Sequence, residues 1–199
     1  MKEELDGIEQ IGAYFFSTVD VSGGDRTVRE RATFTEALMF EYTKVQPLMG
    51  RVFTVEDNQE GAQKVAVISY RFWQVQFGGK PDILGHQVIV NGEQTEIIGV
   101  MPEGYLFPNS INIWLPIQRD LSTVDRADYI GLEVFLLLQK SYPISKVNAQ
   151  LTALMKRMEI EYPDSNTGNS AVAKNYRMSV MGHGGMIIAI AMMSSVLFI

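Results

Sequence analysis

The sequence contains no cysteine, only two histidines and no phosphate-binding loop. Without cysteine the chain can form neither disulfides nor thiolate metal sites, and it has no thiol nucleophile. The pairs Gly23-Gly24 and Gly78-Gly79 stand outside any G-x-x-x-x-G-K-S/T pattern, the loop that holds ATP phosphates in many nucleotide hydrolases. The sequence therefore predicts that this chain does not hydrolyse ATP.

Extended basic clusters are also missing, and the formal net charge is -6 over 199 residues. This balance argues against a nucleic-acid partner, which requires a concentrated positive surface. Hydrophobic residues make up 46% and charged residues 20% of the chain, as in ordinary globular proteins. The length allows one large domain or two small lobes. The N-terminal residues lack the charged-then-apolar order of a signal peptide.

The C-terminal segment 184–199 carries no charged side chain. As a helix it would be about 24 Å long, whereas a full crossing of the bilayer needs about 20 residues. We therefore interpret residues 184–199 as the start of a transmembrane helix; the alternative is a buried C-terminal helix or strand. Met186, Met192 and Met193 would then contact lipid or neighbouring side chains, and they form no copper-binding pattern.

A strand followed by a helix is predicted near the middle of the chain. The apolar run Val65–Ile68 indicates a buried strand, and Ser69 after it is suited to cap a helix. Gly78-Gly79 is a typical helix stop. The apolar face of this helix recurs at helical spacing and consists of Tyr70, Trp73 and Phe77.

A β-hairpin follows the break at Pro81. Asn91-Gly92 connects the runs 88–90 and 95–100, and this dipeptide favours a tight turn because both positions tolerate positive φ. A last short strand, Ile111–Leu115, ends at Pro116.

The N-terminal part predicts another hairpin, with strands over 11–21 and 27–34. Thr33 and Glu36 have capping-box spacing before a short helix. Residues 50–63 are polar and acidic, which is typical of a surface loop. One face of the short helix would be formed by Leu38, Met39, Tyr42 and Val45.

After Pro116, the polar stretch 118–128 is the best candidate linker. The apolar run 132–138 predicts a central strand, and 175–181 a final one. The longest helix lies between them and begins near Ser145, and its length suits a crossover between parallel neighbours. Its apolar stripe is Val147, Leu151, Leu154, Met155, Met158 and Tyr162.

Ser69 is also the strongest candidate nucleophile, because a serine between a strand and a helix matches the position of a nucleophile elbow. Its neighbours Ile68 and Tyr70 are too large for the G-x-S-x-G turn, so capping is the favoured role. His86 and His183 lie far apart in sequence, and neither has a metal-ligating neighbour at short spacing.

The acidic residues Glu56, Asp57 and Glu60 could hold a hard cation, but their spacing is not that of an EF-hand, and a solvated loop is favoured. Phe72, Trp73 and Phe77 could form an aromatic ligand patch, although core packing is favoured on a helix that follows a buried strand. We therefore predict no catalytic, cofactor-binding or metal-binding residues, and a binding or coupling module rather than an enzyme.

Several motifs together resemble the MacB-like periplasmic core domain of MacB- and FtsX-like ABC-transporter permeases. They occur in family order and cover about a third of the chain in detail. The motifs are Gly50-Arg51 with Phe53 and Glu56-Asp57, then VAVIS, FWQVQFGG, DILGHQVIVNG, IIGVMPEGYLFP and IWLPI.

The resemblance implies an α+β fold with two lobes. One is an α/β porter-like lobe made from both chain ends, residues 1–79 and 119–183. The other is a small inserted β-rich lobe, residues 80–118, and residues 184–199 begin a membrane helix. In the family, one membrane helix precedes this domain and others follow it. We expect the strand over 132–138 to share a sheet with the N-terminal strands.

The resemblance also implies a non-catalytic domain outside the inner membrane that couples ATP-driven helix movement to export or to a periplasmic partner. The implied partners are an ATP-binding domain or subunit, a periplasmic or outer-membrane protein, a second copy of the chain, and the membrane through the C-terminal helix. Two alternatives stay open from the residues alone. They are a ligand-binding module with an inter-lobe cleft and, more weakly supported, a hydrolase using Ser69 or an acidic pair.

Overall fold

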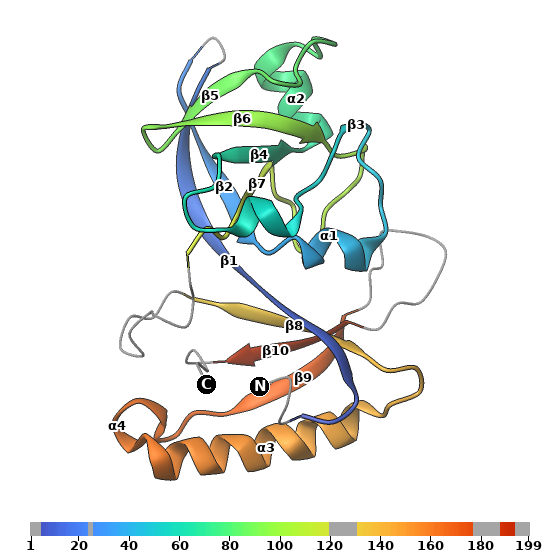
Figure 1. Cartoon of the computed structure of the whole chain (residues 1–199), viewed down its shortest axis with the longest axis vertical. Helices are drawn as coiled ribbons and strands as arrows, with labels where there is room; N and C mark the ends of the chain where they lie inside the picture. The colour runs from blue at the N-terminus through green and yellow to red at the C-terminus, as the bar shows by residue number, and fades with distance from the viewer. Residues whose placement is uncertain (1–4, 24–25, 120–130, 177–187, 194–199) are drawn as a thin grey trace. The chain divides into compact units, whose positions relative to one another are not determined.

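The computed structural model describes residues 5–23, 26–119, 131–176 and 188–193, and it has a mixed α/β fold (Figure 1). The backbone separates into two compact units, residues 1–15 with 120–199 and residues 16–119. Strand β1 (Ile8–Ser22) contributes to both of them. We refer to these as the first and the second unit.

The first unit contains an antiparallel sheet in the order β1-β8-β10-β9. Residues 8–14 of β1 pair with β8 (Glu133–Leu138), which confirms that the strand predicted over 132–138 shares a sheet with the N-terminal strand. Strand β8 also pairs with β10 (Ile188–Met193), so it is central, as its apolar sequence predicted. Strand β9 (Ala171–Tyr176) lies at the edge of this sheet.

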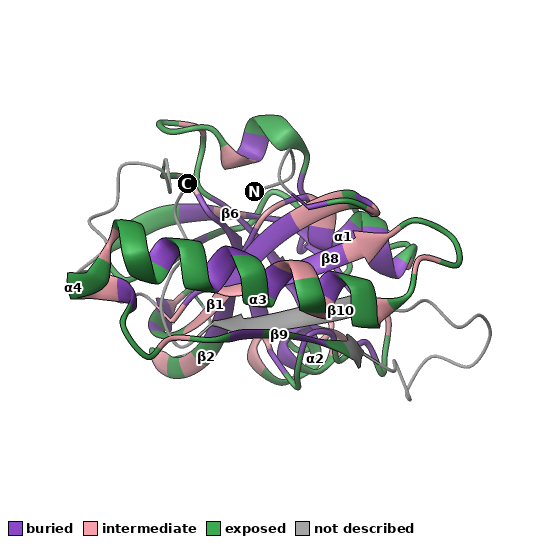
Figure 2. Cartoon of the chain, turned by 90° about the horizontal axis from the view of Figure 1, so that it is seen from below, coloured by how far each residue is buried: buried purple, intermediate pink, exposed green. Residues whose placement is uncertain are grey.

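Helix α3 (Ile144–Glu161) packs on this sheet and is followed by the short helix α4 (Pro163–Asn166). Figure 2 shows buried residues along one face of α3 and exposed residues along the other. The predicted stripe is confirmed for five of its residues: Val147, Leu151, Leu154, Met155 and Met158 are buried against Ile8 of β1, Val134 and Leu136 of β8, and Ala171 and Ala173 of β9. Its last predicted member, Tyr162, directly follows α3 and is partly buried against the same cluster.

The C-terminal segment differs from the prediction. Residues 188–193 form strand β10 instead of part of a membrane helix, and the rest of 184–199 lies outside the described residues. A short apolar run fits a strand with neighbours on both edges as well as it fits a helix, because periodicity alone does not separate the two. Among the described helices, none is both long and apolar enough to cross a bilayer.

The position of β10 also corrects the predicted crossover. Strands β8 and β9 run parallel, because each is antiparallel to β10, but they are not neighbours. Helix α3 therefore connects two strands with room for a third between them. The final strand also begins earlier than expected, at Ala171 instead of Asn175.

The second unit contains a sheet with the strand order β2-β7-β4-β6-β5-β1. The first and last strands of this order, β2 and β1, also pair with each other, so the sheet is closed. Its strands are β2 (Val28–Thr35), β4 (Val65–Ile68), β5 (Gln87–Val90), β6 (Glu93–Val100) and β7 (Ile113–Pro116), with the end of β1. The short strand β3 (Met49–Gly50) pairs with β6. Every residue of β4 is buried, as its apolar sequence predicted.

Several local predictions are confirmed in this unit. Helix α2 (Tyr70–Phe77) begins at Ser69, whose Oγ accepts a hydrogen bond from the Phe72 N–H at 3.0 Å, and ends at Gly78 in the left-handed conformation. Asn91 and Gly92 have φ of 50° and 87°, as a type I′ turn requires. Phe72, Trp73 and Phe77 are buried in the core, as expected.

Two other expectations are wrong. The sequence places residues 16–79 in the lobe made from the two chain ends. In the structure, β2 pairs with β7, and β4 pairs with β6 and β7, so residues 16–79 lie in one unit with residues 80–118. The predicted capping box also fails. Thr33 lies within β2, and helix α1 (Leu38–Thr43) begins after Ala37 without a side-chain cap.

Candidate functional site

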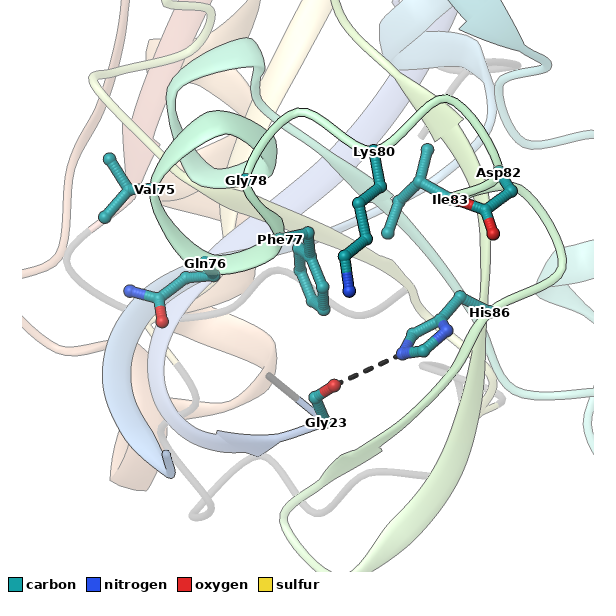
Figure 3. Close-up of a pocket in the computed structure, with 9 residues that line it drawn as sticks. All are labelled: Gly23, Val75, Gln76, Phe77, Gly78, Lys80, Asp82, Ile83 and His86. Atoms are coloured by element: carbon teal, nitrogen blue, oxygen red, sulfur yellow. Dashed lines mark hydrogen bonds between the residues drawn. The ribbon is translucent and has the colours of Figure 1, made fainter. Parts of the chain in front are cut away.

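A surface hollow of about 440 Å³ lies beside the C-terminal end of α2, within the second unit (Figure 3). The residues that line it come from the end of β1, from α2 and from the loop that leads to β5. They are Gly23, Val75, Gln76, Phe77, Gly78, Lys80, Asp82, Ile83 and His86. We call this the α2 hollow.

The loop around the α2 hollow is fixed by backbone contacts. The indole N–H of Trp73 donates to the Lys80 carbonyl at 2.9 Å, which holds the chain against α2 as it leaves the helix. The His86 N–H then donates to the Ile83 carbonyl at 3.1 Å and closes a turn before β5. The site is therefore built on a defined backbone.

His86 joins two walls of the hollow. Its Nε2 lies 3.2 Å from the Gly23 carbonyl at the end of β1, and because a carbonyl can only accept, Nε2 donates this hydrogen bond. Its ring also packs edge-on against Phe77, with ring centroids 5.6 Å apart. His86 directly precedes β5 and forms part of the wall of the hollow.

Charges of both signs lie at the α2 hollow. Lys80, Asp82 and His86 are exposed, and within the described residues neither Lys80 nor Asp82 forms an ion pair. Phe77 and Ile83 are 7% and 3% exposed and form an apolar floor of small exposed area. The arrangement offers one cation, one anion and a small apolar contact area.

A second hollow of about 410 Å³ lies at the other end of α2 and includes Ser69, Arg71, Glu103, Tyr105 and Asn112 in its lining. Val75, which is 66% exposed, lines both hollows. The Ser69 hydroxyl donates to Asn112 Oδ1 at 3.1 Å, and Asn112 Nδ2 donates to Glu30 at 2.8 Å. This hydrogen-bond chain joins the start of α2 to β2, and it contains no imidazole that could act as a base for Ser69.

The acidic loop is organised by an ion pair. Asp57, in the short 3₁₀ helix η1 (Val55–Asn58), accepts hydrogen bonds from Arg51 at 2.5 and 3.0 Å and from the Thr54 N–H at 2.7 Å. Burial raises the pKa of the Asp57 carboxyl, but the bonds from Arg51 and Thr54 outweigh burial and hold the pKa below its ordinary value. In the part of the chain that the structure describes, no group of three acidic or imidazole side chains is arranged to hold a metal ion.

Replacing Asp57 by Asn is expected to lower the free energy of unfolding at pH 7 by about 1–2 kcal/mol, because a charge-assisted bond within the fold is lost. Half of the Arg51 side chain is exposed, which keeps the loss small. Since the folded pKa is depressed, this contribution is present above the unfolded value of about 3.9 and disappears as the pH falls through the folded value. Urea denaturation of the variant and the wild type at pH 7 and at pH 3 measures the loss of stability and its dependence on pH.

The matched control is Asp20→Asn, because Asp20 pairs with Arg29 at 3.0 Å on the open surface. Such a pair contributes little, so this variant should unfold like the wild type at both pH values. An equal loss for Asp57→Asn at pH 7 and pH 3 would show that the carboxylate charge is not what stabilises the loop.

Sequence patterns single out Phe77 and His86 separately and give no indication of Lys80 and Asp82. These two residues flank Pro81 in a stretch that signals only the end of a helix. No spacing indicates that the chain folds back along α2 there. His183, Met186 and Gly24 lie outside the described residues.

Comparisons with known proteins place the fold. The protein-family model of the MacB-like periplasmic core domain matches residues 1–154 of the sequence. The chain is similar to the extracellular domain of the noncanonic ABC-type transporter YknZ from Gram-positive bacteria, with 17% identity, a TM-score of 0.59, and 82% of this chain and 81% of that chain covered.

It is also similar to the periplasmic region of MacB from Actinobacillus actinomycetemcomitans, with 16% identity and a TM-score of 0.62. This likeness covers 83% of this chain and 72% of that chain. At these identities the structural likeness shows the fold. No curated protein sequence matches the chain.

Proposed function

This chain belongs to the MacB-like periplasmic core domain family of ABC-type permeases, and we propose that it couples ATP-driven movement of membrane helices to events in the periplasm. The match over residues 1–154 carries this proposal. ABC transporters work with an ATP-binding domain or subunit, so such a partner supplies the energy. The event served is export of a substrate or movement of a periplasmic or outer-membrane partner.

A physical route for the coupling is offered by β1. Its residues 8–14 pair with β8 in the first unit, and Val21 and Ser22 pair with β5 in the second. A hydrogen-bonded strand resists stretching, so displacement of the first unit would pull on the second through the same backbone. We propose that the two units correspond to the two lobes of the domain. Membrane helices of the permease would carry the domain, and two copies of the chain would act as a homodimer.

The coupling domain is proposed to be non-catalytic. The Ser69 hydroxyl caps α2 and bonds to Asn112, so its hydrogen-bonding capacity serves the fold. Asp57 is likewise occupied by Arg51 and Thr54. These contacts give the two strongest sequence candidates structural roles.

Labelling of a single introduced cysteine tests the extracytoplasmic location. These 199 residues contain no cysteine, so Glu103→Cys, in a complete permease from which any cysteines outside this domain have been removed, provides one reactive thiol in an exposed turn. A membrane-impermeant maleimide is expected to label it in intact spheroplasts, before lysis. Ala66→Cys is the matched control, because this residue is buried in β4 and should react only after denaturation. Labelling of Glu103→Cys that requires lysis would place the domain on the cytoplasmic side and reject the proposal.

A further inference from the structure

The α2 hollow has the size and floor of a small-molecule site. Its volume of about 440 Å³ falls within the range of about 300–1,000 Å³ that ligand pockets occupy. Phe77 and Ile83 line it with side chains that are 7% and 3% exposed, so a small apolar area faces the hollow. An apolar group of a few carbon atoms could pack against this area.

The polar groups at the hollow are of opposite charge and remain available. Figure 3 shows the Lys80 side chain extending beside the Phe77 ring, and Asp82 on the loop just beyond. Lys80 and Asp82 are separated by a single residue, yet they do not pair with each other or with another side chain of the described residues. A ligand with both charges could satisfy them together, which a purely anionic or cationic ligand could not.

We propose that the α2 hollow binds a small zwitterion of amino-acid to dipeptide size that carries an apolar side chain. Lys80 binds its carboxylate, Asp82 binds its ammonium group, and Phe77 and Ile83 contact its apolar side chain. His86 acts as a positioning residue, because its bond to Gly23 and its packing on Phe77 hold two walls together. This inference does not depend on the coupling role of the domain.

Simpler ligands fit these residues less well. An inorganic anion would use Lys80 but would be repelled by Asp82 and would make no use of the apolar contacts of Phe77 and Ile83. Among the described lining residues, a divalent cation would find one carboxylate, Asp82, with the neutral side chains of Gln76 and His86 and with the Lys80 ammonium beside them. The mixture of charges and apolar surface therefore favours an amphipathic zwitterion.

The test is an NMR titration of the whole 199-residue chain with glycyl-L-leucine at millimolar concentration. Two derivatives serve as matched probes: the N-acetyl form lacks the ammonium group, and the C-terminal amide lacks the carboxylate. We expect glycyl-L-leucine to shift the backbone amide signals of residues 76–86 and to bind about tenfold more tightly than either derivative, because each loses one charge-assisted contact.

Variants assign each charge to its partner. Lys80→Met should weaken the binding of glycyl-L-leucine about tenfold and leave the binding of the amide unchanged. Asp82→Asn should weaken the binding of glycyl-L-leucine to a similar extent and leave the binding of the acetyl form unchanged. Lys64→Met removes an exposed lysine elsewhere on the second unit and should have no effect. Thermal unfolding of each variant checks that the exposed substitutions preserve the fold.

Three results would overturn the proposal: no shifts at residues 76–86, equal affinity for all three probes, or equal weakening of every probe by Lys80→Met. Tight binding of the acetyl form alone would also reject it, because it would identify an anion site.

Discussion

Deleting residues 182–199 is expected to unfold the first unit and leave the second unit folded. Strand β10 pairs with β8 along one edge and with β9 along the other, so its removal breaks both ladders. Strand β9 then has no partner strand among the described residues, and α3 covers a sheet reduced to β1 and β8. Two strands rarely support a stable sheet. The expected loss is about 5 kcal/mol or more, comparable with the total stability of a small domain.

Hydrogen exchange followed by mass spectrometry measures this effect unit by unit. In the shortened chain the amides of β8 and α3 should exchange rapidly, whereas those of β4 and β6 should stay protected. The matched control deletes only residues 194–199 and keeps β10, and it should exchange like the full chain. Normal protection of β8 in the chain that ends at Met181 would mean that β10 adds nothing to the first unit, as a membrane-helix interpretation of the tail implies.

Local elements could be predicted from sequence because their signals act over a few residues. Ser69 caps α2 as a serine between a strand and a helix should, and Asn91-Gly92 makes the expected turn. The apolar stripe of α3, which includes Leu151 and Leu154, predicts the face of the helix that is buried. Each of these features depends on contacts within one or two turns of the chain.

Most features that depend on distant pairing could not be predicted from local patterns. The pairing of β1 with β8 was expected from the family resemblance, but no local pattern shows that β1 also pairs with β5 at its end. The tail was misinterpreted because its apolar composition suits lipid and an enclosed strand equally. Thr33 has capping-box spacing to Glu36, but pairing of β2 with β7 keeps Thr33 in a strand. Tertiary contacts override local propensity in these places.

The candidate site was hidden for the same reason. Phe77 was predicted as a core residue, and it is buried, but its ring also lines the α2 hollow. Lys80 and Asp82 become neighbours of His86 because the loop closes between α2 and β5. The bond from Trp73 to the Lys80 carbonyl fixes this loop, and sequence spacing does not reveal it.

Interrupting β1 is expected to separate the movements of the two units. Inserting Gly-Ser-Gly-Ser between Phe15 and Phe16 places a flexible linker where the chain passes from the first unit to the second. An even number of inserted residues keeps the alternation of side chains on both halves of the strand. The covalent connection through residues 120–130 is unchanged. The same insertion between Lys140 and Ser141, in the exposed turn after β8, is the matched control.

The measurement is energy transfer from a fluorophore on the domain to labelled lipids, in the complete permease with its ATP-binding partner in nanodiscs. The fluorophore is attached at Lys156→Cys on α3 or at Glu103→Cys in the second unit, both exposed positions. Coupling predicts that ATP changes the transfer at both positions in the wild type and in the turn-insertion control. The β1 insertion should preserve the change at position 156 and abolish it at position 103. An unaltered response at position 103 after the β1 insertion, or no response to ATP at either position in the wild type, would contradict coupling through β1.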